Sequence, residues 1–275
     1  MKNNPNNLFS LKDKVIIITG GAGLLGLSYA EILGKSGANV VLWDICDPLH
    51  MEKILKTLAK KGVIADAESV DITNENKIKD AVAHVLEKYK RIDGLINNAA
   101  MNPAVGSTDA SSQFVPYEDY PIDLWEKELK VNLTGALICT KAVVKTMIKQ
   151  KSGSIINIGS DVSIIAHDHR VYNDFSGTRF KSIAYSTTKT ALVGFTRQWA
   201  ARLGRYNIRV NTFSPTGIQT PAHSKDFAKR YGDTTMFGRM AKPEDYSGAI
   251  IFLCSDASAF MTAQNLIVDG GKTAW

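Results

Sequence analysis

The sequence contains few cysteines, and the three that are present form no recognisable motif. Cys46, Cys139 and Cys254 lie far apart in a chain of 275 residues. They provide neither the paired C-x-x-C spacing of a zinc site nor the even-numbered framework of a disulfide-stabilised domain. We therefore expect ordinary reduced thiols and a cytoplasmic protein.

Long apolar segments and concentrated charge are also missing. The first residues, MKNNPNNLFS, lack the apolar core of a signal peptide. No uninterrupted apolar run approaches the roughly 20 residues that cross a bilayer, so no membrane span is expected. The net charge of +6 is spread along the chain, with its densest groups at 60–61 and 88–91. Because basic residues are not interleaved with aromatic ones, we expect no nucleic-acid partner.

What the sequence does contain is an alternation of short β-branched runs with longer helical repeats. Strands are predicted over 14–19, 39–44, 63–70, 92–97, 153–159, 207–213 and 265–269, and helices over 24–36, 49–61, 74–89, 121–149, 182–204 and 243–255. This alternation predicts a Rossmann-type, doubly wound parallel α/β sheet with helices on both faces. The length would permit two domains, but no linker or repeat divides the chain. We predict a single dinucleotide-binding and catalytic domain over 1–275, with a flexible segment at 1–10.

A glycine-rich stretch, TGGAGLLG at 19–26, joins the first predicted strand to the first predicted helix. Gly21, Gly23 and Gly26 fit the pattern G-x-G-x-x-G in this context. Glycine lets the backbone approach a pyrophosphate, and the following helix supplies free N–H groups. The stretch therefore predicts a dinucleotide site, and a tight turn without a ligand is the weaker alternative.

Asp44 stands at the end of the second predicted strand, at about the spacing where a carboxylate binds the ribose hydroxyls of a dinucleotide. A carboxylate there repels a 2′-phosphate, and no Arg or Lys follows at once. NAD is therefore favoured over NADP. The alternative is an aspartate that only caps a helix or lies at the surface.

Tyr185 and Lys189, in YSTTK, are four residues apart in a predicted helix, so both lie on one helix face. In isolation such a pair indicates an ordinary solvated helix face. A proton-transfer pair is the more specific hypothesis, and only the rest of the sequence decides between the two.

Together, the motifs resemble the short-chain dehydrogenase/reductase family over almost the whole chain. The segments that carry the resemblance are TGGAGLLG, VDIT (70–73), NNAA (97–100), VNLTG (131–135), GSIINIGS (153–160), YSTTK, IRVNTFSPTGIQT (208–220) and VDGG (268–271). Leu24 departs from the commonest glycine pattern of the family. The spacing Gly20, Gly23, Gly26 is similar to the extended branch, but only four residues follow VDGG, so that branch is not favoured.

The resemblance implies a role for each matching residue. The catalytic set would be Asn132, Ser160, Tyr185 and Lys189, and Asn97 would lie beside the cofactor. The cofactor contacts would be Gly20, Gly23, Leu24, Leu25, Gly26, Asp44, Asp71, Ile72, Asn98, Ala99, Ala100, Tyr185, Lys189, Pro215, Gly217, Ile218 and Thr220. The implied reaction is NAD(H)-dependent interconversion of a secondary alcohol and a ketone, without a metal. The family also implies a homo-oligomer, a tetramer or a dimer.

The chemistry explains why a tyrosine and a lysine are paired. A free tyrosine has a pKa near ~10, too high for a ready base near neutrality. A nearby ammonium and the positive charge of the nicotinamide ring favour the phenolate, so we expect Lys189 and the bound cofactor together to lower the pKa of Tyr185.

The clearest departure from the family lies between Ser160 and Tyr185, whose separation of 25 residues is about twice the common one. We expect the insertion 166–181 and the long loop 101–120 to form a polar wall and lid at the mouth of the site. The candidate hydrogen-bonding residues are His167, Asp168, His169, Arg170, Asn173, Asp174, Ser176 and Arg179. The aromatic residues Tyr172, Phe175 and Phe180 could stack on a sugar face or pin the loop to the core, and pinning is favoured. Two histidines without a clear third ligand do not make a metal site.

This insertion favours a sugar or another polyhydroxylated small-molecule substrate, and hence carbohydrate metabolism. The alternative is a surface or subunit-contact insertion without a substrate role. Two other functions stay open: an NAD-binding sensor without turnover, and an epimerase or lyase that retains its cofactor.

Overall fold

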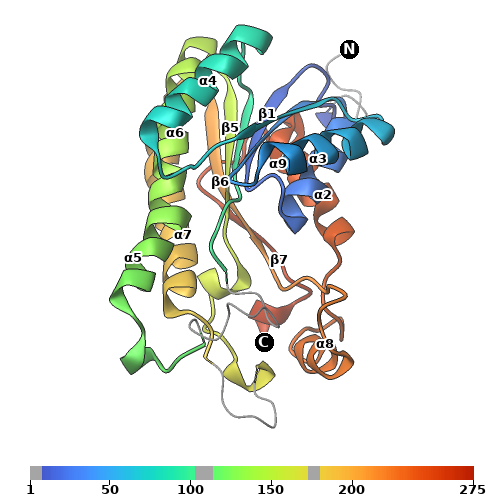
Figure 1. Ribbon diagram of the computed structural model, residues 1–275, viewed down its shortest axis with the longest axis vertical. Helices are drawn as coiled ribbons and strands as arrows, with labels where there is room; N and C mark the ends of the chain where they lie inside the picture. The colour runs from blue at the N-terminus through green and yellow to red at the C-terminus, as the bar shows by residue number, and fades with distance from the viewer. Residues whose placement is uncertain (1–7, 103–113, 173–179) are drawn as a thin grey trace.

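The computed structural model describes residues 8–102, 114–172 and 180–275. At its centre, seven parallel strands follow the order β3-β2-β1-β4-β5-β6-β7 (Figure 1). The strands are β1 (Val15–Thr19), β2 (Asn39–Asp44), β3 (Ala65–Ser69), β4 (Gly94–Asn97), β5 (Gly153–Ile158), β6 (Ile208–Pro215) and β7 (Asn265–Val268). The chain reverses its direction across the sheet between β1 and β4, which is where such sheets bind ligands.

Helices cover both faces of this sheet, as the alternating pattern predicts. One face packs against α2 (Leu24–Lys35), α3 (Pro48–Lys60) and α9 (Ser247–Cys254), and the other against α4 (Glu75–Tyr89), α6 (Gly135–Gln150) and α7 (Ile183–Leu203). The residues of β1 show why both faces of the sheet need to be covered. Ile16 and Ile18 belong to the first core and Val15 and Ile17 to the second, because successive side chains of a strand point to opposite faces.

The predicted strands and helices are confirmed, with ends that differ by two residues or fewer except at the start of the helix predicted over 243–255. The start of the predicted helix at 243 is a 3₁₀ turn, Pro243–Tyr246, which leads into α9. One helix, α8 (Lys225–Gly232), is missing from the prediction. It has eight residues, and the Ser224 hydroxyl that caps it accepts from the Phe227 N–H. Two helical turns are too short to produce a clear period in sequence.

The predicted helix at 121–149 is observed as α5 (Ile122–Leu129), a π-helical turn (Lys130–Thr134) and α6, which continue one another. By length and composition this helix could cross a membrane, a property that counting uninterrupted apolar runs does not detect. α6 instead packs against β4, β5 and α4, and Cys139, Val143 and Met147 are fully buried there. Packing against the sheet explains its apolar composition.

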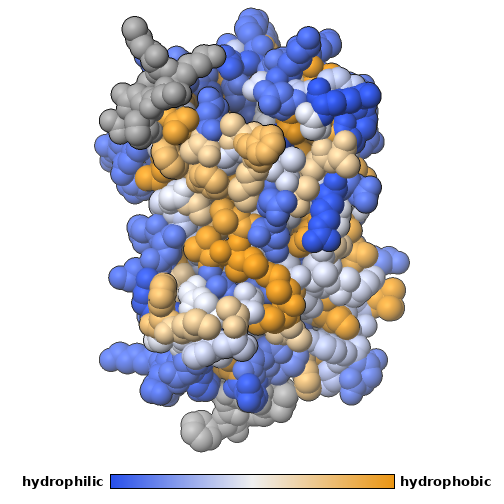
Figure 2. Space-filling view, turned by 180° about the vertical axis from the view of Figure 1, so that it is seen from behind, coloured by the Kyte–Doolittle hydropathy of each residue, from blue (hydrophilic) through white to orange (hydrophobic). Residues whose placement is uncertain are grey.

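β7 forms an edge of the sheet, and several apolar side chains near it are exposed. Ile267 of β7 is exposed, and so are Phe260 and Trp275 on either side of it in the sequence. Figure 2 shows that apolar residues gather across the middle of the face seen from behind. Exposed apolar surface of this kind marks interaction sites in many proteins.

Candidate active site

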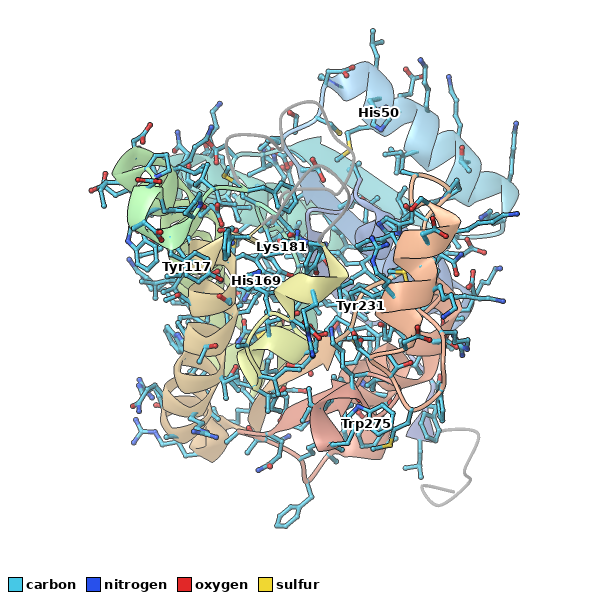
Figure 3. All side chains as sticks on the ribbon, turned by 90° about the horizontal axis from the view of Figure 1, so that it is seen from below. His50, Tyr117, His169, Lys181, Tyr231 and Trp275 are labelled. Atoms are coloured by element: carbon cyan, nitrogen blue, oxygen red, sulfur yellow. The ribbon has the colours of Figure 1, made fainter. Side chains whose placement is uncertain are left out.

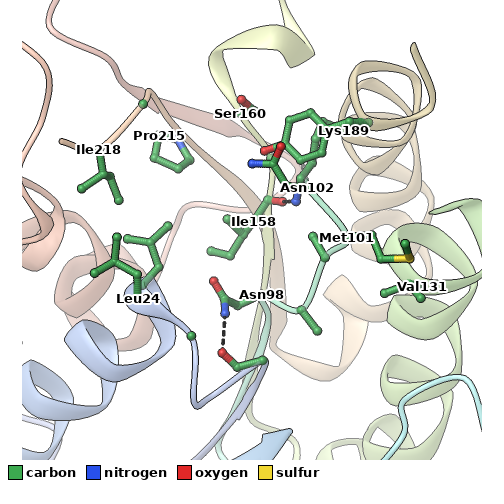
Figure 4. Close-up of a pocket in the computed structure, with 18 of the residues that line it drawn as sticks. Leu24, Asn98, Met101, Asn102, Val131, Ile158, Ser160, Lys189, Pro215 and Ile218 are labelled. Atoms are coloured by element: carbon green, nitrogen blue, oxygen red, sulfur yellow. Dashed lines mark hydrogen bonds between the residues drawn. The ribbon is translucent and has the colours of Figure 1, made fainter. Parts of the chain in front are cut away.

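A cavity of about 1160 Å³ lies at the carboxyl ends of the strands. Each of five strands supplies a residue of its wall at or just after its end: Gly20 after β1, Asp44 on β2, Asn98 after β4, Ser160 after β5 and Pro215 on β6. Figure 4 shows Leu24 and Asn98 on one side of this space and Ser160 and Lys189 on another. The parallel topology therefore brings distant motifs to one place.

The glycine stretch forms a turn in which side chains have no room. Gly20 has a φ of +61°, in the left-handed region that favours glycine. A Cβ on Gly26 would lie 2.2 Å from the Gly20 carbonyl oxygen, and one on Gly21 would lie 2.8 Å from the Leu42 Cβ. Gly23 precedes α2 and has no side chain to cap the helix. The N–H groups of the first turn of α2 are therefore available to a ligand. These features fit the pyrophosphate of a dinucleotide.

Two aspartates line the next part of the cavity, where the dinucleotide's adenosine half would lie. Asp44 accepts from the N–H of Ala22 (2.9 Å) and of Cys46 (3.2 Å), so its carboxylate is fixed beside the glycine turn. Asp71 accepts from Thr73, and Ile72 lies next to it in the wall. The residues present fit NAD(P).

The opposite part of the cavity brings together Ser160, Tyr185 and Lys189, as predicted. Ser160 precedes a 3₁₀ turn, Asp161–Ser163, and Tyr185 lies in the first turn of α7, whose N-terminus the Ser182 hydroxyl caps. The Lys189 ammonium donates to the Ile158 carbonyl (2.6 Å) and lies 5.5 Å from the centre of the Tyr185 ring.

In the protein alone, Lys189 does not bring the pKa of Tyr185 below its usual value, and the joint effect expected with the nicotinamide ring stays a prediction. Burial raises the pKa of Tyr185 well above its usual value, and the charges of Asp161 and Glu128 raise it further. Burial also lowers the pKa of Lys189 to about 8. Desolvation of the phenolate therefore outweighs the ammonium, which is bonded to a carbonyl, and Tyr185 is a phenol at neutral pH.

Asn132 and Asn97 lie behind the cavity wall. Asn132, in the π-helical turn, exchanges two hydrogen bonds with the backbone of Met101 (2.7 and 3.1 Å) and donates to the Thr188 hydroxyl (3.2 Å). It thus fixes the segment after β4 against α7. Asn97 bonds to Thr140 and Asn157 inside the protein, so the expectation that it lies beside the cofactor is wrong. Its side chain points to the face of β4 that α6 covers, since Thr140 belongs to α6.

Sequence reasoning missed a buried polar cluster behind Ser160. The Asp161 carboxylate accepts from the Ser160 hydroxyl (2.7 Å), the Thr216 hydroxyl (2.8 Å) and the Lys272 ammonium (2.8 Å), and the Tyr231 hydroxyl is 3.3 Å away. Burial alone would raise the pKa of Asp161, but the charge of Lys272 and these hydrogen bonds hold it below its usual value. Asp161, an acidic residue directly after Ser160, was the one sequence signal for this cluster. Nothing in the sequence indicates that its partner is Lys272, 111 residues away.

The described part of the 166–181 insertion contributes to the cavity wall through His167, Tyr172 and Lys181. Tyr172 packs against Phe227 of α8, which agrees with the expected pinning of the loop. Figure 3 shows His169 and Tyr117 near Lys181, and the Tyr117 hydroxyl is 3.0 Å from the His169 Nε2. Asp168 pairs with exposed Arg170 away from the cavity. Residues 173–179, with the predicted Asn173, Asp174, Phe175, Ser176 and Arg179, and residues 103–113 lie outside the described part of the chain.

All the predicted cofactor contacts except Gly26 line the cavity. Those that line the cavity are Gly20, Gly23, Leu24, Leu25, Asp44, Asp71, Ile72, Asn98, Ala99, Ala100, Tyr185, Lys189, Pro215, Gly217, Ile218 and Thr220. Gly26 lies beneath the turn and shapes it. The fold and this site define a dinucleotide-dependent oxidoreductase of the Rossmann type.

Comparison with known proteins leads to the same class of enzyme. A family model described as enoyl-(acyl carrier protein) reductase matches residues 22–273. The chain belongs to the short-chain dehydrogenase/reductase family, and it is an enzyme of the alcohol dehydrogenase or ketoreductase type. It is 32% identical to an NAD-dependent glycerol dehydrogenase of Listeria innocua, with 96% of each chain aligned.

Two solved structures are similar over nearly the whole chain. A gluconate 5-dehydrogenase of Burkholderia cenocepacia, in complex with NADP and tartrate, has a TM-score of 0.85 at 27% identity, covering 99% of this chain and 100% of that one. An NAD⁺-bound xylitol dehydrogenase has a TM-score of 0.82 at 29% identity, covering 95% and 99%.

Gly26→Ala should disrupt the dinucleotide turn, because the added Cβ meets backbone atoms that cannot move independently. We expect a loss of about 1–3 kcal/mol in the free energy of unfolding and weaker NAD binding, measured by urea denaturation and calorimetry. Gly248→Ala in α9 is the matched control, since its Cβ meets nothing within 4 Å. It should change stability by between zero and a gain of about 1 kcal/mol. Normal NAD affinity in Gly26→Ala would contradict the assigned turn.

Proposed function

We propose that the protein is an NAD(H)-dependent dehydrogenase that interconverts a secondary alcohol and a ketone of a polyhydroxylated compound. One observation carries the proposal: Ser160, Tyr185 and Lys189 converge in the wall of a cavity that also contains the glycine turn and Asp44. A protein that only bound NAD would need the turn and Asp44 but not this polar set.

When bound, NAD supplies the acceptor for a hydride from the alcohol carbon, and NADH the donor for the reverse step. Tyr185 is the group that moves the proton at the substrate oxygen. As a phenol it is ready to protonate a ketone being reduced, and as a phenolate it takes the proton from an alcohol being oxidised. Because burial raises the pKa of Tyr185, the oxidation should be favoured at higher pH.

Ser160 positions the substrate oxygen. Its hydroxyl hydrogen is donated to Asp161, so the lone pairs of its oxygen can accept a hydrogen bond from a substrate alcohol. Lys189 lies one helical turn from Tyr185 and, held by the Ile158 carbonyl, supports the phenolate when it forms. Asn132 acts in this scheme through Met101 and Thr188, as a positioning residue.

Asp44 supports NAD as the preferred cofactor. Its carboxylate is fixed in the cavity wall between apolar Trp43 and Ile45, and it would repel a 2′-phosphate. The similar glycerol dehydrogenase is named NAD-dependent and the xylitol dehydrogenase has NAD⁺ bound, while the gluconate 5-dehydrogenase has NADP.

A polyhydroxylated substrate and a role in carbohydrate metabolism agree with the polar residues of the substrate end and with the names of these three relatives. We further propose a homo-oligomer that uses the exposed apolar side chains around β7, and a cytoplasmic location in keeping with three free cysteines. An epimerase or lyase that retains its cofactor would convert substrate without net formation of NADH, which distinguishes it in the same assay.

Tyr185→Phe should lower kcat for polyol oxidation about 10²–10⁴-fold, because it removes only the hydroxyl that moves the proton. NAD affinity, measured by calorimetry, should be nearly unchanged. Tyr206→Phe, outside the cavity wall, is the control and should retain wild-type turnover. Substantial residual activity in Tyr185→Phe would remove Tyr185 from the mechanism. Wild-type protein that yields no NADH with any member of a polyol, aldose and alcohol panel would contradict the proposed function.

Asp44→Ala should narrow the preference for NAD over NADP in kcat/KM by roughly tenfold, because the repulsion of the 2′-phosphate is lost. Asp47→Ala is the matched control. Asp47 also follows β2, but its carboxylate caps α3 by accepting from the His50 N–H. Asp47→Ala should lower the free energy of unfolding and leave the preference for NAD over NADP unchanged. A wild-type preference for NADP would refute the role of Asp44.

A further inference from the structure

We propose that Asp161, kept ionised by Lys272, makes the site bind the alcohol form of the substrate in preference to the ketone. This inference rests on the proposed function and adds a specificity-determining residue to it. Asp161 acts through Ser160, which lies in the cavity wall (Figure 4), and it is therefore a positioning residue. Its effect comes from the direction in which the Ser160 hydroxyl donates its hydrogen.

The Asp161 carboxylate uses both of its oxygens fully. Its Oδ1 accepts from the Ser160 hydroxyl (2.7 Å) and from the Val162 N–H (2.9 Å). Its Oδ2 accepts from the Thr216 hydroxyl (2.8 Å) and from the Lys272 ammonium (2.8 Å). An ionised carboxylate offers about four lone-pair sites and no hydrogen. The four donors occupy those sites, and in the bond between Ser160 and Asp161 the serine must be the donor.

Tyr231 of α8 completes the network around this carboxylate. Its hydroxyl oxygen accepts from the Gly217 N–H (2.9 Å) and from the Lys272 ammonium (3.1 Å). The Thr216 hydroxyl, 3.0 Å away, already gives its own hydrogen to Asp161, so Tyr231 is the donor between these two hydroxyls. Each hydroxyl hydrogen of the cluster then has a partner. A buried network satisfied in this way is rigid and has one favoured arrangement.

Lys272 keeps Asp161 in its charged form and is itself held in place by the final turn of the chain. The Asp269 carboxylate accepts from the N–H groups of Gly271 (2.9 Å) and Thr273 (2.7 Å), on either side of Lys272. The Lys272 side chain is only 9% exposed. Burial alone would raise the pKa of Asp161, but the charge of Lys272 and the hydrogen bonds hold it below its usual value. Asp161 is therefore a carboxylate at neutral pH.

Ser160 and Tyr185 then offer the substrate oxygen one acceptor and one donor. The Ser160 oxygen has two lone pairs, and the Val162 N–H, 3.5 Å away, uses at most one of them. Tyr185 is a phenol, because burial raises its pKa, and it can donate its hydrogen. An alcohol oxygen can accept from Tyr185 and donate to Ser160. A ketone oxygen has no hydrogen to donate, so it would face the lone pair of Ser160, and such sites reject the analogue that lacks the hydrogen.

Asp161→Asn should reverse this preference without changing the shape of the side chain. Thr216 and Lys272 are both donors, so the amide oxygen should turn toward them and the amide nitrogen toward Ser160. The Ser160 oxygen then accepts from the amide, and its hydrogen is free to donate to a ketone. Lys272→Met should act in the same direction, because a buried carboxylate without its counter-ion takes up a proton that it can donate to Ser160.

The test measures, at neutral pH, the Kd of a ketone divided by the Kd of the corresponding alcohol. The probes are glycerol with dihydroxyacetone and cyclohexanol with cyclohexanone, and calorimetry gives each Kd. The protein is loaded with tetrahydro-NAD, a reduced analogue that cannot donate a hydride and whose ring has no positive charge to ionise Tyr185. Ser160→Ala is the reference, because water solvates alcohols and ketones differently. The wild-type ratio should exceed that of Ser160→Ala about tenfold, and the ratio of Asp161→Asn should fall below it.

A double-mutant cycle shows whether Asp161 acts through Ser160. Asp161→Asn should change the ratio in the wild-type background and leave it unchanged in the Ser160→Ala background. Lys272→Met should lower the ratio as well, and Asp161→Asn keeps the test valid if Lys272→Met fails to fold. Asp256→Asn is the matched control, since it removes the carboxylate of another Asp–Lys pair, with Lys14, outside the cavity wall. It should leave the ratio unchanged.

Three results would overturn the inference: a wild-type ratio no higher than that of Ser160→Ala, an effect of Asp161→Asn that persists in the Ser160→Ala background, or loaded wild-type protein that binds no probe. None of these measurements depends on hydride transfer. If alcohols of the broader panel yield NADH while the ratio is unaffected by Asp161→Asn, the dehydrogenase proposal stands and this inference falls. If the ratios behave as expected but no alcohol yields NADH, the selectivity stands and the dehydrogenase proposal falls.

Discussion

The arrangement of the site depends on one buried carboxylate. Asp161 is 3% exposed, and a charge so far from water is stable only where donors surround it. Those donors come from the end of β6 (Thr216), from the last turn of the chain (Lys272) and from Ser160 itself. The requirement to compensate this charge therefore fixes the C-terminal segment against the turn after β5. It also sets which way the Ser160 hydroxyl points, and so which atom of Ser160 faces the substrate.

The same carboxylate adds to the effect of burial on the pKa of Tyr185. Moving a phenol into the protein interior disfavours its ionised form, and the negative charges of Asp161 and Glu128 act in the same direction. The protein thus holds Tyr185 as an acid until the cofactor and substrate change its surroundings. Lys272, by neutralising Asp161, limits that effect and at the same time presents a cation to the cavity.

Much of this could be predicted from the sequence, for a physical reason. Parallel strands alternating with helices must place the residues at the strand ends along one edge, and Gly20, Asp44 and Ser160 line one cavity there. Local spacing also placed Tyr185 and Lys189 on one face of a helix. The features of the site that could not be predicted depend on burial and on contacts between residues far apart in the sequence. The pairing of Asp161 with Lys272 has no local signature, and the raised pKa of Tyr185 follows from desolvation that only the folded chain reveals. The role of Asn132 in fixing Met101 depends on a π-helical turn, a feature without a sequence pattern here.

The central claim is that the Tyr185 phenol moves the proton and that the charge of Asp161 adds to burial in raising its pKa. It is tested most directly by the pH dependence of kcat/KM for alcohol oxidation at saturating NAD, in wild-type protein and in Asp161→Asn. Removing a negative charge beside a phenol lowers the pKa of that phenol. The account therefore predicts that the rise of kcat/KM with pH moves to lower pH in Asp161→Asn, by about one pH unit or more. An unchanged profile, or a shift to higher pH, in a folded variant that still binds NAD would contradict it.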